Sequence, residues 1–313
     1  MIIKLVASFW FRAVLSVSIL SYLVTSLDWR GAVEATVAVD GHYLLAAVLA
    51  DLSARTTMIS RWVLLLRSTG STISIWSTAR IFLISSFIGM ALPTGGADVT
   101  RAYAVSRRVA NGSTAIASVA VDRLLGVAAL LTLGIVGLAL SPPHEARVFS
   151  TLLIGLCAVT AVILGVSFSA DRIIRFILPA IVQRTPAGTW LTAVSDGIAH
   201  YRKRRWILAV VFVQSLLVQG LRIVEVFLLG SGLGLNIDLN YYLMFMPIGL
   251  LALMLPISIA GIGLPQGVIV WLLRPAGVPD SSSFALSILI IMLGVLGTLP
   301  GLYLYLRPRR GVR

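Results

Sequence analysis

The segments ALPTGGAD (residues 91–98) and LPISIAGIGLPQG (residues 255–267) each interrupt a long apolar stretch of the chain. Proline removes a backbone donor and glycine leaves the backbone free to turn, so neither stretch can continue as one straight helix. The apolar stretches around them run over about residues 76–106 and 242–274. We therefore predict a helix, a break and a second helix at each of the two places.

The composition of the chain is that of a membrane protein. Of its 313 residues 58% are hydrophobic and only 12% are charged, and the mean hydropathy is +0.98. A soluble domain is nearer half apolar and a quarter charged. We predict a single all-α domain over residues 1–313, a polytopic bundle with about six full spans beside the two broken segments. Each span is long enough to cross about 30 Å of hydrocarbon, and they lie near residues 9–27, 42–66, 113–140, 148–169, 206–230 and 283–306.

The net charge of +13 comes from 25 Lys and Arg against 12 Asp and Glu. Such an excess is typical of cytoplasmic loops in polytopic proteins, because basic residues resist translocation. This interpretation is favoured over nucleic-acid binding. The single Cys157 cannot form an internal disulfide, and the three histidines are scattered, so we expect no metal site and no cofactor.

The positions of the basic residues indicate how the broken segments are oriented. If residues 76–106 crossed the membrane once, Arg101, Arg107 and Arg108 would lie outside. A re-entrant hairpin that enters from the cytoplasm keeps all three at the inner side, together with the basic loop at 170–206. The second hairpin then enters from outside. Both termini are predicted to be cytoplasmic, in a bacterial inner membrane.

The resulting order of elements predicts an inverted repeat with halves of about 1–140 and 147–306, as is common in transporters. The loop at 170–206 contains apolar residues at helical spacing over 172–182. This spacing fits an amphipathic helix on the cytoplasmic leaflet, and it also fits a helix packed beneath the bundle.

Ionisable residues at membrane depth are costly, so each requires a partner or a role. Asp51 and Arg55 are four residues apart, and Arg222 and Glu225 are three apart. Residues at these spacings share a helix face, so we interpret both as structural ion pairs. The complete set has six arginines and four acids: Asp51, Arg55, Arg61, Arg80, Asp98, Arg101, Asp122, Arg123, Arg222 and Glu225.

The residues around the first break favour an anionic ligand. Asp98 and Arg101 follow the break directly, and Asp122-Arg123 lies about ten residues into the next span, roughly 15 Å deep. A surplus of arginine suits a phosphate, which a guanidinium binds with two parallel hydrogen bonds. A half-helix that starts after Gly95-Gly96 would add free N–H groups. The alternative is that these arginines only pair with the two aspartates.

Three motifs in order resemble the lysylphosphatidylglycerol synthase transmembrane family. They are ALPTGGADVTRAY (91–103), VDRLLG (121–126) and LPISIAGIGLPQG (255–267), with Arg61-Trp62 before a leucine run. The resemblance covers essentially the whole chain. It implies a membrane domain that moves lipids or lipid-linked groups between leaflets, and it gives weight to Asp98, Arg101, Asp122 and Arg123. The family's usual glutamate of the last motif is Gln266 here.

We therefore expect a flippase-like protein for an anionic, phosphate-bearing lipid, without the aminoacyl-transfer activity of longer relatives. The alternative is a membrane enzyme or accessory subunit in polyprenyl-linked glycosylation or lipid modification, with a lipid-modifying enzyme or glycosyltransferase as partner. We predict no catalytic residue. The candidate substrate-binding residues are Arg101, Arg123, Asp98, Asp122, Gly95, Gly96, Arg61, Arg80 and Gln266.

Overall fold

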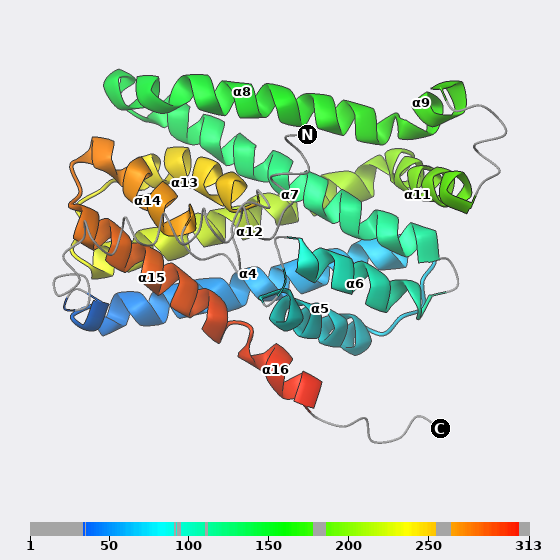
Figure 1. Cartoon of the computed structure of the whole chain (residues 1–313), viewed down its shortest axis with the longest axis horizontal. Coiled ribbons are helices and arrows are strands. Elements are labelled where there is room, and N and C mark those ends of the chain that lie inside the picture. Colours follow the sequence, from blue (N-terminus) through cyan, green and yellow to red (C-terminus); the bar gives the residue numbers. More distant parts are fainter. Residues whose placement is uncertain are drawn as a thin grey trace, which may run out of the picture.

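The computed structural model of the chain describes residues 34–306, apart from residues 35, 91, 93–94, 110–111, 178–185 and 255–263. Every regular element in this part of the chain is a helix (Figure 1), which confirms the predicted all-α class. The first predicted span, at 9–27, lies outside the described residues.

Four described segments are long and apolar enough to cross a membrane: Gly112–Leu140, Phe149–Phe168, Arg205–Gly232 and Asp280–Leu306. All four coincide with predicted spans. The remaining predicted span, at 42–66, is the 28-residue helix α4 (Gly41–Ser68), which is long enough to cross but carries Asp51, Arg55 and Arg61 along its length. The chain is thus a multi-pass membrane protein.

The first broken segment forms two helices that pack against each other, α5 (Ile75–Met90) and α6 (Gly96–Ser106). They run antiparallel, because Phe82 in the first half of α5 packs beside Val105 near the end of α6. Gly95 precedes α6 with a φ of 88°, a left-handed conformation that favours glycine. The predicted break between helices is therefore present, although Pro93 and Thr94 lie outside the described residues.

The second broken segment forms the pair α13 (Leu239–Met254) and α14 (Leu264–Leu273). The Tyr241 hydroxyl donates a hydrogen bond of 2.8 Å to the Leu272 carbonyl, which joins the start of α13 to the end of α14. This pair is also antiparallel. Residues 255–263, which include most of the predicted break, lie outside the described part.

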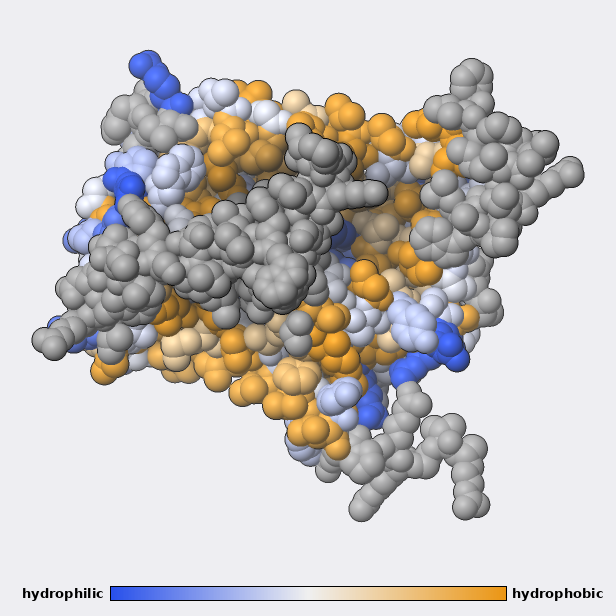
Figure 2. Space-filling view, in the orientation of Figure 1, coloured by the Kyte–Doolittle hydropathy of each residue, from blue (hydrophilic) through white to orange (hydrophobic). Residues whose placement is uncertain are grey.

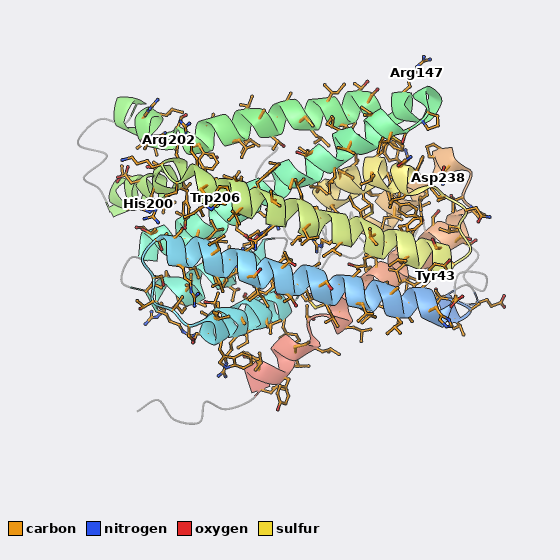
Figure 3. All side chains as sticks on the ribbon, turned by 180° about the vertical axis from the view of Figure 1, so that it is seen from behind. Tyr43, Arg147, His200, Arg202, Trp206 and Asp238 are labelled. Atoms are coloured by element: carbon orange, nitrogen blue, oxygen red, sulfur yellow. The ribbon has the colours of Figure 1, made fainter. Side chains whose placement is uncertain are left out.

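The centre of the bundle consists of α4 and α12 (Arg205–Gly232), which lie side by side and run antiparallel (Figures 1 and 3). Near one end the Asp40 N–H donates to the Gly232 carbonyl at 3.1 Å, and nearer the other Arg61 donates to Ser215 at 2.8 Å. The helix α7 (Gly112–Leu140) packs on α12 and on the second hairpin.

The last two helices complete the bundle on the opposite side. They are α15 (Asp280–Leu296) and α16 (Leu299–Leu306), and α16 packs against α5 of the first hairpin. The Arg80 guanidinium donates a hydrogen bond of 3.3 Å to the Leu304 carbonyl, which contributes to this contact. Each hairpin is thus covered by the long helix or helix pair that ends the other half of the chain.

The segment between the halves contains more helix than predicted. After α8 (Pro143–Phe168), the short α9 (Ala170–Ile177) confirms the start of the predicted helix at 172–182, whose later residues fall outside the described part. The helix α11 (Pro186–Arg202) was taken for part of a loop, which is wrong. Its Tyr201 is fully buried against α4 and α7 residues, so packing keeps α11 folded.

An ion pair joins these two short helices. Arg202 contacts both carboxylate oxygens of Asp171 at 3.1 Å, and it also donates to the Phe168 carbonyl at 2.6 Å. The hydrogen bond from Arg202 holds the pKa of Asp171 below its usual range. These contacts favour the interpretation in which the segment packs against the bundle.

Polar residues gather at the two ends of the molecule and apolar residues across its middle (Figure 2). Figure 3 shows His200, Arg202 and Trp206 at one end and Tyr43, Arg147 and Asp238 at the other. Exposed aromatic residues lie near helix ends, as expected where a bilayer meets water. They include Tyr43, Trp76, Tyr103, Trp206, Trp271, Tyr303 and Tyr305.

A glycine on α7 permits the close approach of α13. A Cβ atom at Gly137 would lie 2.6 Å from the Leu243 Cβ and 2.8 Å from the Met244 nitrogen. We expect Gly137→Val to lower the free energy of unfolding in detergent micelles by about 1–3 kcal/mol, because the two helices must separate. Gly155→Val on α8, where a Cβ meets nothing within 4 Å, is the control. Equal unfolding free energies for the two variants would contradict this packing.

Candidate functional site

A cavity of about 180 Å³ lies where the tip of the first hairpin meets α4, α7 and α12. Asp122 borders it ten residues after the start of α7, which is about 15 Å along that helix. Because α7 is 29 residues long, the cavity lies well inside the span. Six ionisable residues line it: Arg61, Asp98, Arg101, Asp122, Arg123 and Arg222.

Asp122 is the centre of this charged group. It is 3% exposed, and its two carboxylate oxygens contact different arginines: Arg61 Nε at 2.7 Å and Arg101 Nη2 at 3.2 Å. A buried carboxylate requires such partners, since desolvation of an unpaired charge costs several kcal/mol. The contacts also join three elements, because Arg61 belongs to α4, Arg101 to α6 and Asp122 to α7.

Arg101 is held on several sides. Besides Asp122, it donates to Asp98 at 3.1 Å, and its guanidinium lies 4.9 Å from the centre of the Trp62 ring and 5.5 Å from that of Phe82. A cation over aromatic faces gains further stabilisation when it is desolvated. With 4% exposure and these partners, Arg101 fixes the hairpin tip to α4 and α7.

Arg123 is much less constrained. Its side chain is 45% exposed, and its Nε lies 3.5 Å from Asp98 Oδ2, a long and weak contact. The predicted pairing of the aspartates with Arg101 and Arg123 is therefore present, but Arg61 takes part in it as well. Most of the Arg123 hydrogen-bonding capacity remains open to the cavity.

Arg222 also lines the cavity, and it was missing from the predicted site. The predicted ion pair with Glu225 is wrong, since no carboxylate of the described residues lies within ion-pair distance of Arg222. The other predicted pair is confirmed, with Arg55 Nε 2.6 Å from Asp51 Oδ2. Spacing along the chain shows which residues can share a helix face, but the way that face turns depends on the packing of α12.

The backbone of the hairpin tip borders the cavity too. Gly95 and Ala97 line it on either side of Gly96, where α6 begins. The first turn of α6 therefore lies at the cavity wall, as predicted for a half-helix that presents free N–H groups.

Two predicted site residues lie elsewhere. Arg80, near the start of α5, bonds to the Leu304 carbonyl of α16 and does not line the cavity. Gln266 is buried in the first turn of α14, in the second hairpin. The structure thus brings Arg61, Asp98, Arg101, Asp122, Arg123 and Gly95 together with Arg222, and leaves Arg80 and Gln266 outside.

The charge balance of the cavity is positive. Four arginines face two aspartates, so two positive charges have no counter-charge among the residues that line it. At this depth an uncompensated charge is costly, and a ligand that carries negative charge would offset that cost.

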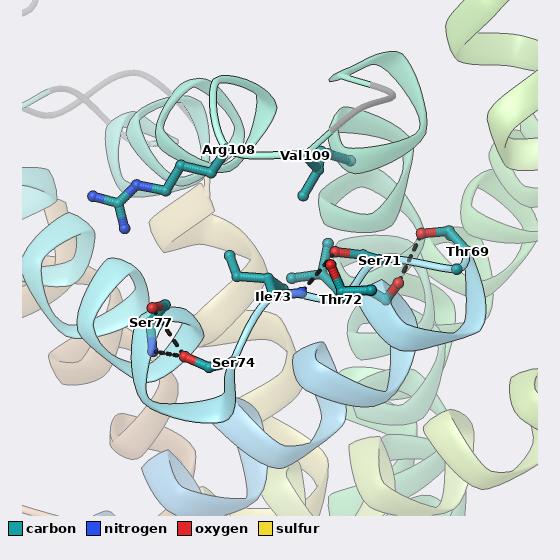
Figure 4. A pocket seen from close by; sticks show the side chains of 11 residues that line it. Thr69, Ser71, Thr72, Ile73, Ser74, Ser77, Arg108 and Val109 are labelled. Atoms are coloured by element: carbon teal, nitrogen blue, oxygen red, sulfur yellow. Dashed lines mark hydrogen bonds between the residues drawn. The ribbon is translucent and has the colours of Figure 1, made fainter. Parts of the chain in front are cut away.

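A larger cavity of about 470 Å³ lies at the loops that join α4 to α5 and α6 to α7 (Figure 4). Hydroxyl groups line it, among them Thr69, Ser71 and Ser74, but Arg108 is the one ionisable residue of its lining. Some of the hydroxyls bond within the loop, as Ser74 does with the Ser77 N–H at 3.1 Å. This loop cavity lies apart from the buried charges. No group of three or more His, Cys, Asp or Glu in the described part could hold a metal ion.

Residues 4–301 match the family described as the lysylphosphatidylglycerol synthase TM region. No curated protein and no solved structure matches the chain. The family match covers nearly the whole sequence, including all the residues of the cavity.

Proposed function

This chain belongs to the lysylphosphatidylglycerol synthase transmembrane family, and from that premise we propose that it moves an anionic, phosphate-bearing lipid from one leaflet to the other. Family membership makes it a membrane protein related to lipid handling. The observation that carries the finer proposal is the cavity inside the span, whose four arginines outnumber its two aspartates.

Two arginines hold the headgroup in this proposal. Arg123 has one long contact to Asp98, and Arg222 has no carboxylate partner in the described part, so both can turn to a phosphate. A phosphate accepts charge-assisted hydrogen bonds from guanidinium groups, and these are about twice as strong as neutral ones. Arg61 and Arg101 position the site, because Asp122 already neutralises them.

The proposal includes the two hairpins as re-entrant elements. Their helices of 16 and 11 residues, and of 16 and 10 residues, are short for a crossing that needs about 20. Irregular backbone at the tips is tolerated in a membrane where it lines a polar cavity. The end of the bundle that carries Arg67, Arg107 and Arg204 would face the cytoplasm of a bacterial inner membrane.

The test is translocation by the purified protein in phosphatidylcholine vesicles that contain a trace of fluorescent phosphatidylglycerol. A membrane-impermeant quencher reports how fast the inner-leaflet lipid reaches the outside. We expect the protein to accelerate this exchange at least tenfold over protein-free vesicles, and to move a fluorescent neutral diacylglycerol no faster than those vesicles do. Exchange equal to that of protein-free vesicles would contradict the proposal.

A further inference from the structure

The two halves of the bundle have matching elements. The first half has helices of 28, 16, 11 and 29 residues (α4, α5, α6, α7), and the second has 28, 16 and 10 residues (α12, α13, α14) and then a 27-residue segment over α15 and α16. The starts of α4 and α12 are 164 residues apart (from 41 to 205), as are those of α5 and α13 (from 75 to 239). After the breaks the separation is 168 residues, from 96 to 264 and from 112 to 280.

One hydrogen bond occurs twice at these separations. Arg55 on α4 donates to the Gly294 carbonyl on α15 at 3.3 Å, and Gln219 on α12 donates to the Gly126 carbonyl on α7 at 3.0 Å. Positions 55 and 219 are 164 apart, and positions 126 and 294 are 168 apart. Each half therefore makes the same contact to the closing helix of the other half.

The hairpin contacts repeat in the same way. A Cβ at Gly134 on α7 would lie 3.1 Å from Pro247 on α13, and a Cβ at Gly301 on α16 would meet the Leu83 carbonyl on α5. Positions 83 and 247 are 164 apart, and 134 and 301 correspond to within one residue. Because α4 and α12 are antiparallel, the two halves are related by inversion about an axis near Arg55 and Gln219.

The cavity of the first half reaches this axis. Met58 and Arg222 both line it, and they are counterparts of each other, 164 residues apart. Arg222 thus belongs to the first cavity and also to the place that corresponds to it in the second half. There Glu225 stands for Arg61, Gln266 for Asp98 and Ile291 for Arg123, by the same separations. Glu225 and Gln266 are both buried.

We infer that α12, α14 and α15 form a second subsite for the same phosphate-bearing headgroup, with Arg222 shared between the two subsites. This inference rests on the proposed function. In the second subsite isoleucines replace Arg101, Asp122 and Arg123, at Ile269, Ile290 and Ile291. Gln266 and Arg222 provide its hydrogen bonds, and Glu225 opposes the phosphate charge. It therefore binds the headgroup more weakly than the first subsite does, as a release site must.

The first test uses two single-cysteine proteins made in a Cys157→Ser background, Ile291→Cys and Met292→Cys. Ile291 is half-buried on the side of α15 that corresponds to Arg123, whereas the adjacent Met292 is 49% exposed. Short-chain phosphatidylglycerol is expected to slow maleimide labelling of Ile291→Cys by about fivefold and to leave that of Met292→Cys unchanged. Equal rates with and without the lipid at both positions would overturn the inference.

The second test is the Gln266→Leu variant, which removes a hydrogen-bonding group at nearly constant volume. We expect translocation of fluorescent phosphatidylglycerol to fall about tenfold, with equilibrium binding of the short-chain lipid unchanged because the first subsite is intact. A purely structural role would lower binding and thermal stability together. Translocation at the unmodified rate would contradict the second subsite, while an unmodified protein that moves no lipid would contradict the proposed function itself.

Discussion

Asp122→Asn is expected to lower the free energy of unfolding in detergent micelles by about 3–5 kcal/mol, because it leaves two buried guanidinium groups short of a counter-charge. Asp122 is the only carboxylate that contacts Arg61 in the described part of the chain, at 2.7 Å, and it also contacts Arg101. Removal of its charge releases α4, α6 and α7 from one another at the same point.

The control for this variant is Asp280→Asn. Asp280 forms an ion pair of 2.7 Å with Arg274, but both side chains are at least 41% exposed. Exposed pairs contribute about 0–1 kcal/mol, so this substitution should have little effect. Equal losses of stability in the two variants would show that the Asp122 network does not hold the hairpin. Restoration of stability by Arg61→Met in the Asp122→Asn protein would identify the uncompensated charge as the cause.

The double substitution Arg123→Ala with Arg222→Ala should reduce translocation of phosphatidylglycerol by about 100-fold or more. Each guanidinium contributes a hydrogen bond to a charged group, at about 1.5–3 kcal/mol, and 1.4 kcal/mol corresponds to a factor of ten. The fold should survive, because Arg123 is 45% exposed with one long ion-pair contact and Arg222 has no carboxylate partner in the described part.

Arg80→Ala is the matched control for the loss of an arginine. Arg80 is also in the first hairpin but lies outside the cavity, where it bonds to the Leu304 carbonyl. Its replacement is expected to leave the translocation rate within about twofold of the unmodified protein, since no headgroup contact is lost. If the double variant also moved lipid at that rate, the cavity would not be the headgroup site.

Features that depend on local chemistry could be predicted from the sequence. Proline and glycine in ALPTGGAD end one helix at Met90 and allow another to begin at Gly96, because the effect of these residues on a helix requires no tertiary contact. The Asp51–Arg55 pair was predictable for the same reason, as the two residues share one helix face.

Features that depend on packing between distant segments could not be predicted. Arg222 and Glu225 have the spacing of an ion pair, but the rotation of α12 against α4 and α7 brings Arg222 to the cavity. Arg61 and Asp122 are 61 positions apart in the chain, and only the fold shows that they touch. The helix α11 has few apolar residues to reveal it, and its folding depends on burial of Tyr201 against its neighbours.

The central claim is that the arginine-rich cavity binds the phosphate of a lipid. The most direct measurement is an experimental structure of the protein with short-chain phosphatidylglycerol bound. We predict phosphate density within hydrogen-bond distance, about 3 Å, of the Arg123 and Arg222 guanidinium groups, with Arg61 and Arg101 still bound to Asp122. Phosphate density at the loop cavity of Thr69 and Ser74, with the arginine-rich cavity free of lipid, would contradict the claim.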